Sequence, residues 1–492
     1  MQKRTLVAWF SHCLLLIVPL IAFGQTYVNG EVYGVWDVSS SPYYVTDEIT
    51  VEEMESLTIY EGVEVYFLGL DALTVKGTLR ILGQPGDSVY FNSDPHDADD
   101  PNWTGLVFTN TAGLESEIGY ASIHNCATGV RADTIAPRIY NSLINADNIG
   151  LNIDGAILEI TDTDFVIENC SSALRLRSPH ATITRCTVHA FNPSITWASY
   201  GIYSEHSNFD DDFDTFIEMR ESNIFVYSEG MAIGVFLMSL DHSIFQRNII
   251  YASGKSSTTG LKIVNTDSIP RHWFDHQTIV IESASTIDKA VIVESVGRPS
   301  ITNSIIYADG PSFGIYADLG AQPNVQYCDV ANVDYPYVNF LEGDGCIEED
   351  PLFKNFYEKN FHITEGSLCI DAGSPDSPLD PDGTRADIGR FYYMQVGVEP
   401  GPARVISAEL ISAYPNPFNA EVKIELVLPY QTQGGFAIYN QAGQRVHLLQ
   451  SGNFMPGSYR FNWKAEMVSS GKYWAVFESK NQKLVQPLIL IK

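Results

Sequence analysis

A short phrase recurs through the middle of the chain and constrains its fold more than any other feature. The phrase places one small residue before alternating apolar positions, and its first positions step by 21, 23, 28, 33, 26, 30 and 24 residues. A second phrase, which sets polar residues before two apolar ones, interleaves with it at a similar period. Two ladders with one slightly irregular period indicate a single structural coil that is repeated. The small residues that open the first phrase are Gly129, Gly150, Ala173, Gly201, Gly234, Gly260, Ala290 and Gly314.

This period predicts a solenoid of short strands. Each coil has room for two or three strands with alternating side chains. One coil cannot bury its inward face, whereas stacked coils form a continuous core with like residues above like. We therefore predict an all-β chain built mainly as a right-handed parallel β-helix. Its coils should run from Tyr43 to about Pro336, with Ile249 in the core, asparagines bonded along the stack at turns, and an insertion near 204–218.

Residues 1–24 have the pattern of a secretory signal peptide. Lys3 and Arg4 give a positive start, an apolar segment follows, and small residues precede the expected cleavage before Gln25. The alternative is a membrane anchor, but the apolar stretch is short for one. We expect no transmembrane segment in the mature chain.

The net charge is strongly negative. There are 60 acidic and 29 basic residues, which gives −31, and removal of Lys3 and Arg4 with the signal peptide takes the charge to −33. Such a charge repels phosphate backbones, so it argues against nucleic-acid binding. Polyanionic sugars would also be repelled unless divalent cations intervened.

The cysteines are too sparse for a disulfide scaffold. None forms a C-x-x-C pair, which argues against a zinc site. Cys346 and Cys369 lie close together in a turn-rich region and are the candidate disulfide. The six cysteines that follow the signal peptide are Cys126, Cys170, Cys186, Cys328, Cys346 and Cys369, of which the first three fall in or beside the repeat and are expected in the core.

Two segments of the β-helix region resemble known proteins. Residues 43–93, with their Leu-Thr-Ile, Glu-Gly-Val and Leu-Thr-Val-Lys-Gly-Thr-Leu phrases, resemble the opening of bacterial pectin-lyase-like right-handed β-helix proteins. Residues 350–389, from Asp-Pro-Leu-Phe to Ala-Asp-Ile-Gly, are similar to the closing region of surface proteins of the choice-of-anchor type. Arg390 departs from that pattern, which usually has a small residue there. The resemblance implies a secreted β-helix with a closing cap over residues 25–396.

The C-terminal part resembles a different family. Residues 405–492 resemble the C-terminal sorting domain of the type IX secretion system, in Tyr-Pro-Asn-Pro-Phe-Asn, Ile-Tyr-Asn-Gln-Ala-Gly-Gln, Gly-Lys-Tyr and the final Leu-Ile-Lys. Alternating strands in this region predict a small Ig-like β-sandwich, and residues 397–404 are the linker before it. The resemblance implies that the type IX machinery is a partner and that the protein is secreted or on the cell surface.

No catalytic, cofactor-binding or metal-binding residue is assigned. Lyases of this fold need carboxylates for calcium and a basic residue, and hydrolases need converging carboxylates. Arg175, Arg177 and Arg185 are close in sequence, but we interpret them as solvent-exposed side chains and not as a catalytic base. Calcium is the one metal ion that the sequence suggests. Each acidic segment that could bind it can equally be explained as a solvated acidic loop or a turn. These sites are Asp94 to Asp100; Asp210, Asp211, Asp212 and Asp214; and Asp380, Asp382 and Asp387. The pair His272 and His276 has helical spacing in a segment predicted as loop or strand.

Two function classes remain open. The first is a surface or adhesion protein that binds glycans or proteins along the solenoid, and the second is a polysaccharide lyase or glycosidase of the same fold. The outer positions of successive coils favour the first, because no neighbouring pair among them is acidic and the aromatic members suit sugar stacking. These predicted outer positions are Asn152, Arg175, Tyr203, Phe236, Lys262, Ile292 and Tyr316.

Overall fold

A computed structural model describes residues 26–491, with gaps at 95–101, 110–114, 207–214, 266–271, 283, 286, 319, 396–408, 415–417, 429–431, 441–443, 455–456, 466–467 and 480–482. The chain divides into two compact units, one of residues 1–351 with 389–391 and the other of residues 352–388 with 392–492. Across the described ranges the regular structure is β-strand, apart from the 3-10 turn η1 (Val38–Ser40). No described helix has the length and apolarity needed to cross a membrane.

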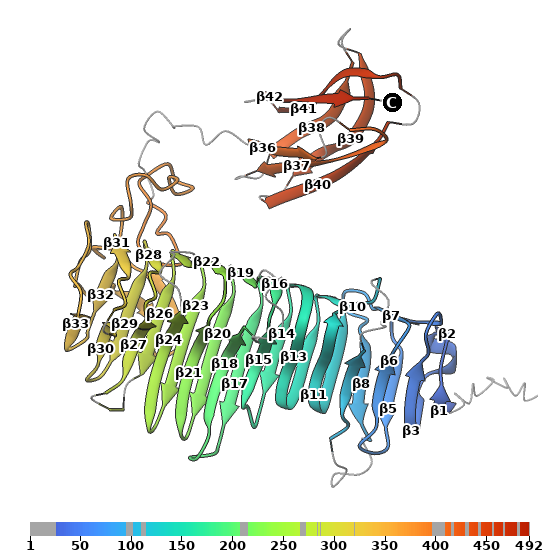
Figure 1. Ribbon diagram of the computed structural model, residues 1–492, viewed down its shortest axis with the longest axis horizontal. Helices are drawn as coiled ribbons and strands as arrows, with labels where there is room; N and C mark the ends of the chain where they lie inside the picture. The colour runs from blue at the N-terminus through green and yellow to red at the C-terminus, as the bar shows by residue number, and fades with distance from the viewer. Residues whose placement is uncertain are drawn as a thin grey trace, which may run out of the picture. The chain divides into compact units, whose positions relative to one another are not determined.

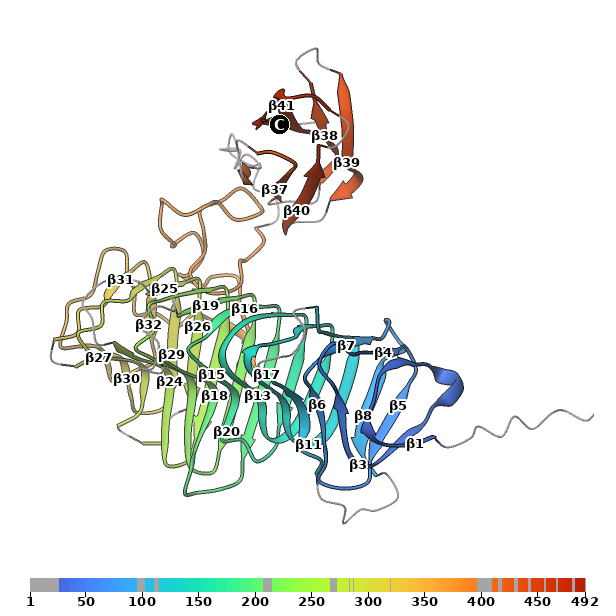
Figure 2. The ribbon, with the colours of Figure 1, turned by 45° about the vertical axis from the view of Figure 1, so that its right-hand side comes forward.

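The first unit is the predicted parallel β-helix. Its 33 strands pair in parallel, each with the strand one coil further on (Figures 1 and 2). The pairings separate into three stacks, so each coil contributes one strand to each of three faces. Strand β1 (Thr26–Glu31) pairs with β3 (Tyr43–Val51), and the coils therefore begin at Thr26, earlier than the predicted Tyr43.

The strands that form each stack are as follows. The first stack holds the start of β3, β5 (Glu64–Phe67), β8 (Val89–Ser93), the starts of β11 (Ala121–Ile135) and β13 (Leu143–Thr161), β14 (Asp164–Ile167), β17 (Thr187–Asn192), β20 (Asn223–Ser228), β23 (Ile249–Gly254), β26 (Thr278–Glu282), β29 (Ile305–Asp309) and β32 (Asp329–Ala331). The second stack holds the end of β3, β6 (Ala72–Val75), β9 (Gly105–Phe108), the middle of β11 and β13, β15 (Ser172–Arg177), β18 (Ala198–Glu205), β21 (Met231–Met238), β24 (Ser257–Asn265), β27 (Lys289–Ser295), β30 (Phe313–Ala317) and β33 (Tyr335–Val338). The third stack holds β2 (Gly34–Trp36), β4 (Ser56–Tyr60), β7 (Thr78–Leu82), β10 (Glu117–Gly119), β12 (Arg138–Tyr140), the end of β13, β16 (His180–Thr184), β19 (Phe216–Arg220), β22 (His242–Gln246), β25 (His272–Asp275), β28 (Ser300–Thr302) and β31 (Asn324–Gln326).

The small residue of the first phrase is required by close packing inside the coils. A Cβ atom on Gly234 would lie 2.4 Å from Cγ2 of Ile250 and 2.5 Å from the carbonyl oxygen of Gly260. Gly201 meets Ile224 and Gly234 in the same way. An isoleucine of the next coil therefore fills the space that a side chain would need, which explains the glycine at these two positions of the phrase.

From β10 onward, each coil turns from the third stack to the first through one residue with left-handed backbone. The φ angle of this residue lies between 48° and 53° in nine successive coils, from Tyr120 to Tyr327. The residue after it is buried, and its side chain often accepts a hydrogen bond from the preceding coil: Asn248 Oδ1 from the Ser222 N–H at 2.9 Å, and Ser304 Oγ from the Gln277 N–H at 3.0 Å. We call this row the polar ladder. It comprises Ser142, Thr163, Cys186, Ser222, Asn248, Gln277, Ser304 and Cys328, so the expected bonding along the stack is present, but mostly through side chains other than asparagine.

Ile249 was expected to point into the core. It instead points outward and is buried beneath a segment that covers the outer face of the coils. The inward residue of β23 is Ile250, which pairs with the buried Ile224 and Ile279 of the adjacent coils. Ile249 belongs to the outward row, and residues 389–391 lie over that row. The sequence pattern Arg-Asn-Ile-Ile fits either register, because a slip of one residue exchanges the two faces.

Arg390 fastens this covering segment to the coils. Its guanidinium donates to the carbonyl oxygens of Glu221 at 3.1 Å, Ser222 at 3.2 Å and Arg247, and its N–H donates to Thr278 Oγ1 at 3.0 Å. Burial lowers the pKa of the guanidinium to about 10, so the group stays charged at neutral pH. Arg390, which departs from the choice-of-anchor pattern, therefore forms hydrogen bonds with several consecutive coils.

The second unit holds a closing segment and the C-terminal domain. In the closing segment, β34 (Phe353–Asn355) and β35 (Asn360–Ile363) form an antiparallel pair. The C-terminal domain is the expected β-sandwich, whose two sheets share one core around Phe436, Trp463 and Phe477. One sheet holds β36 (Glu409–Tyr414), β37 (Glu421–Leu428) and β40 (Gly457–Lys464), and the other holds β39 (Arg445–Phe454), β38 (Thr432–Tyr439), β41 (Gly471–Ser479) and β42 (Lys483–Leu490). The boundaries expected for the linker at 397–404 fall outside the described residues.

We predict that Arg390→Ala destabilises the β-helix. The change removes charged donors from three backbone carbonyls and uncovers the outward row, so it should cost about 1–3 kcal/mol. The midpoint of urea unfolding, followed by circular dichroism, measures this loss. Arg131→Ala is the control, because its guanidinium is exposed and lies 3.8 Å from Asp133; it should cost less than about 1 kcal/mol. Equal losses for the two variants would contradict the role given to Arg390.

Candidate functional site

The predicted outer row lies on the second stack and is confirmed residue by residue. Strand register pairs Asn152 with Arg175, and the pairing continues through every predicted member to Tyr316. Within the row, Tyr203 stacks on Phe236 with ring centroids 5.2 Å apart. Lys262 lies over Phe236 at 5.8 Å and forms an ion pair with Glu294 at 2.9 Å. Internal contacts therefore use several side chains of this row.

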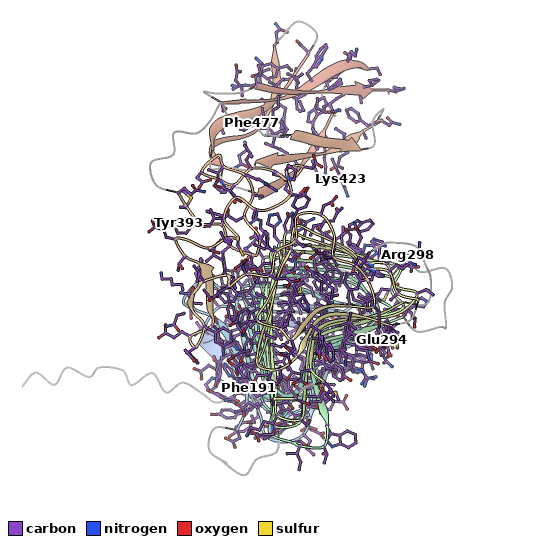
Figure 3. The ribbon with its side chains drawn as sticks, turned by 90° about the vertical axis from the view of Figure 1, so that its left-hand side faces the viewer. Phe191, Glu294, Arg298, Tyr393, Lys423 and Phe477 are labelled. Atoms are coloured by element: carbon purple, nitrogen blue, oxygen red, sulfur yellow. The ribbon has the colours of Figure 1, made fainter. Side chains whose placement is uncertain are left out.

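A larger aromatic surface lies on the first stack. Phe191 and Tyr227 occupy paired positions of β17 and β20 and stack with ring centroids 5.2 Å apart and an interplanar angle of 9°. Tyr227 contacts Tyr251 at 5.3 Å, and His189 stacks on Phe225 at 5.1 Å. Phe191 remains 41% exposed, and Figure 3, which views the coils nearly end-on, shows it at their rim, away from Glu294.

The surface around Phe191 is hollowed. A groove of about 520 Å³ is lined by the two stacked rings and by polar side chains, including Asn169 and the ion-paired Glu229 and Lys255, whose charged atoms are 2.5 Å apart. We call this the aromatic groove. Phe191 and Tyr227 provide flat apolar faces, and the polar side chains provide hydrogen-bond donors and acceptors beside them.

An exposed apolar turn lies next to the aromatic groove. Residues 193–197 connect β17 to β18, and Asn192 holds the turn by accepting from the Ser194 N–H at 2.8 Å and donating to the Cys170 carbonyl at 3.0 Å. Ile195 and Trp197 on this turn are 75% and 72% exposed. Large exposed apolar side chains beside a polar rim are typical of interaction sites.

A charged cleft of about 460 Å³ lies on the third stack. In the strand register Glu117 lies between Arg80 of the preceding coil and Arg138 of the next. Glu117 Oε2 accepts from Arg138 at 2.9 Å and from the Tyr140 hydroxyl at 3.1 Å, and Arg80 pairs with Glu115. Burial and the neighbouring Glu117 raise the pKa of Tyr140. The carboxylate of Glu117 is thus held by the guanidinium of Arg138 and the hydroxyl of Tyr140. This arrangement favours a structural role for the ion pairs of the cleft over a catalytic one.

The acidic calcium candidates have different outcomes. The aspartates at 210, 211, 212 and 214, and those of the 94–100 loop except Asp94, lie outside the described residues. In the closing segment, Asp387 accepts from the N–H groups of Asp371 at 2.7 Å and Tyr393 at 2.6 Å, and Asp382 accepts from Thr384 and Gln395. These bonds fit the turn interpretation. Among the described residues no group of three or more acidic, histidine or cysteine side chains is arranged to hold a metal ion.

The basic and histidine candidates do not converge on one point. Arg177 pairs with Asp154 at 2.8 Å, and Arg185, in a corner of the coils, pairs with Asp162 at 2.6 Å. His272 lies in β25 beside Ser243 Oγ at 3.0 Å, whereas the side chain of His276 lies 2.9 Å from Asp275 at a turn. Each of these side chains therefore has its own partner on a separate part of the solenoid.

All six described cysteines are free thiols. The candidate disulfide between Cys346 and Cys369 is not present in this structure, and the two residues belong to different compact units. Cys126, Cys170 and Cys186 are buried in the core as expected, and burial raises the pKa of each thiol to about 12.

Sequence reasoning missed the aromatic groove. Its signal was present, because Phe191 and Tyr227 follow the apolar phrase at the same position of consecutive coils. The signal could not be interpreted without the register, since His189 and Phe191 alternate with buried Val188 and Ala190 in a pattern that allows either face to point outward.

Comparison with known proteins identifies the C-terminal domain. Residues 412–492 match the family described as the secretion system C-terminal sorting domain. No curated protein matches the chain significantly. A sorting domain of this kind directs export by the type IX secretion system, so the protein is secreted or carried on the cell surface.

We predict a pH dependence from the closing segment. Burial, helped by the nearby Asp371 and Asp382 and opposed by the two N–H donors, raises the pKa of Asp387 to about 6. A raised carboxyl pKa stabilises the folded state below the unfolded value, and this contribution is lost as the pH rises through the folded value. Relative to Asp387→Asn, the chain should therefore unfold at higher urea near about pH 4.5, and this advantage should disappear by about pH 7.5. Asp376→Asn is the control, and an advantage that grows with pH would contradict the assignment.

We predict that the sorting domain is needed for export and not for folding of the β-helix. Its core is separate from the core of the solenoid, so a chain lacking residues 405–492 should fold and accumulate in the periplasm. Fractionation followed by immunoblotting locates the truncated chain, and circular dichroism reports its folding. Undiminished delivery of the truncated chain to the cell surface would contradict this prediction.

Proposed function

We propose that this protein is a non-catalytic surface protein of the pectin-lyase-like, choice-of-anchor type that binds neutral glycans in the aromatic groove. The observation that carries the proposal is the stacked pair of Phe191 and Tyr227, which lines a hollow together with polar side chains. A role in adhesion follows from binding of this kind on an exported solenoid.

The groove has the chemistry that sugar recognition needs. The apolar C–H face of a pyranose packs on an aromatic ring, and the exposed Phe191 of the stacked pair offers such a ring. Ring hydroxyls both donate and accept, so the carboxylate of Glu229, the amide of Asn169 and the ammonium of Lys255 can each bind one. The exposed Trp197 extends the apolar surface beyond the groove.

The charge of the chain selects among glycans. The net charge of −31 and the acidic members of the groove, Glu168 and Glu229, repel carboxylated and sulfated sugars. Lys255 is already paired with Glu229. Neutral hexose polymers are therefore the class that the groove favours, ahead of pectin- or alginate-like polymers.

The route to the cell surface follows from both ends of the chain. A signal peptide at residues 1–24 would take the chain across the inner membrane, and the sorting domain then engages the type IX machinery. The β-helix of residues 25–396 is the part that reaches the extracellular glycan, and residues 397–404 are its tether.

The alternative function is a polysaccharide lyase or glycosidase of the same fold. The charged cleft would be its site, with Glu117 or Glu159 as the acid or base. The ion pairs of Glu117 and Glu115 argue against this function, because a general acid or base must be able to exchange its proton with the substrate.

We predict that Phe191→Ala weakens glycan binding about tenfold or more, since loss of one stacking face costs about 1.4 kcal/mol or more. Isothermal titration against neutral oligosaccharides, chosen from an array of neutral and acidic glycans, measures the dissociation constant. Tyr33→Ala is the matched control, because Tyr33 is 64% exposed in the first coils and does not line the groove.

Two outcomes would contradict the proposal. Unchanged affinity in Phe191→Ala, or an array that selects only acidic glycans, would remove the groove as the binding site. Depolymerisation of a polysaccharide that is lost in Glu117→Gln would place the protein in the enzyme class.

A further inference from the structure

The polar ladder continues into two cysteines at the last coil. Cys328 follows Tyr327, whose φ is 51°, and Cys346 follows Gly345, whose φ is 70°. The Tyr327 N–H donates to the Asp344 carbonyl at 2.9 Å, as the corner residues of earlier coils do to theirs. Cys346 therefore occupies the next rung after Cys328.

The backbone holds these two rungs side by side. The Ile347 N–H donates to the Cys328 carbonyl at 2.8 Å, and the Val330 N–H donates to the Ile347 carbonyl at 3.0 Å. Asp329 and Ile347 form a parallel bridge, which pairs the residues before them. Paired strands lie about 4.8 Å apart, and disulfide-bonded residues have Cα atoms about 4.4–6.8 Å apart.

The two thiols also face the same turn. Cys328 Sγ lies 3.3 Å from the Gln326 carbonyl oxygen, and Cys346 Sγ lies 3.8 Å from that of Val325, the adjacent residue. Side chains of neighbouring rungs reach each other elsewhere in the ladder, since Asn248 Nδ2 and Gln277 Oε1 are 3.2 Å apart. A change of rotamer about the Cα–Cβ bonds can therefore bring the two sulfurs within bonding distance.

No other pair among the described cysteines shares this arrangement. Cys186 is in the same ladder, but its neighbours are Thr163 and Ser222. Cys126 pairs with Ala146 and Trp103. A thiol pair in adjacent rungs thus occurs once in the described coils, at the end of the solenoid.

Export places the pair in an oxidising environment. Disulfides form and persist in the periplasm and outside the cell, whereas cytosolic thiols stay reduced. We propose that Cys328 and Cys346 form a disulfide during export, and that this bond staples the final rung, residues 344–349, to the β-helix.

The reaction needs an external dithiol oxidant in its disulfide form. The Cys346 thiolate attacks one sulfur of that disulfide, forms a mixed disulfide and releases the second sulfur as a thiolate. The Cys328 thiolate then attacks the Cys346 sulfur and releases the oxidant as a dithiol. Two protons and two electrons leave the chain in total, and one S–S bond forms.

Burial decides when the bond can form. Cys328 is fully buried, and burial, together with the neighbouring Cys346, raises its thiol pKa well above the ordinary value. Its thiolate is therefore scarce in the folded chain. Cys346 is only partly buried, so it is the first to react, and the second step should precede closure of the last coil.

Peptide mapping of the exported full-length chain tests the bond. The chain recovered from its own cells is alkylated in denaturant, digested without reduction and analysed by mass spectrometry. We expect four of the six cysteines to be alkylated, and Cys328 and Cys346 to appear in one linked species lacking two hydrogens. Alkylation of all six cysteines, or a link between other cysteines such as Cys346 and Cys369, would overturn the proposal.

Unfolding in urea tests the stapling role. A reductant should lower the midpoint of the exported chain and of Cys186→Ser, the control from the same ladder, but should not change that of Cys346→Ser. A midpoint of the exported chain that is insensitive to the reductant would refute the staple. The mapping needs no variant, so it decides the bond even if Cys346→Ser does not fold.

Discussion

Every other feature of the β-helix depends on the in-register stacking of one coil on the next. Backbone hydrogen bonds between parallel strands fix the register, and two local features make it attainable, one inside the strands and one at a corner. Within strands of the second stack, a glycine leaves room for an isoleucine of the next coil. At the corner between the third and first stacks, one left-handed residue turns the chain, and the polar ladder satisfies backbone donors that the turn would leave buried.

Stacking leaves the outward rows free of the constraints that fix the core. A row of like positions repeats at the coil spacing, so a side chain with a flat face can be placed above another of its kind. The rings of Phe191 and Tyr227 make such a platform, and the row of the charged cleft instead alternates arginine and glutamate. The chemistry of each face thus follows from which residue types repeat along its rows. Export by the type IX system then exposes these faces outside the cell.

The ends of the solenoid need separate solutions, because a terminal coil has a neighbour on one side only. Near the later coils, Arg390 returns over the outward row and bonds to carbonyl oxygens of coils far back in the sequence. At the final rung, two cysteines replace the hydroxyl and amide side chains of the ladder. The bonds of Arg390, and the disulfide proposed for the two cysteines, tie later segments to coils already formed, which suits a stack whose stability is the sum of contacts between neighbours.

The sequence by itself determined the repeat, the parallel β-helix, the row from Asn152 to Tyr316 and the sorting domain, because periodic patterns and local motifs encode them. It could not fix which residues of a uniformly apolar phrase point into the core. Ile249 was therefore expected to point inward, whereas Ile250 does so. The aromatic groove at Phe191 was missed for the same reason. Only the tertiary structure decided these points, together with the contacts of Arg390 and the placement of Cys328 and Cys346 in adjacent rungs. The physical reason is that facing and contact depend on the register between coils, and that register is set by hydrogen bonds between residues more than twenty positions apart.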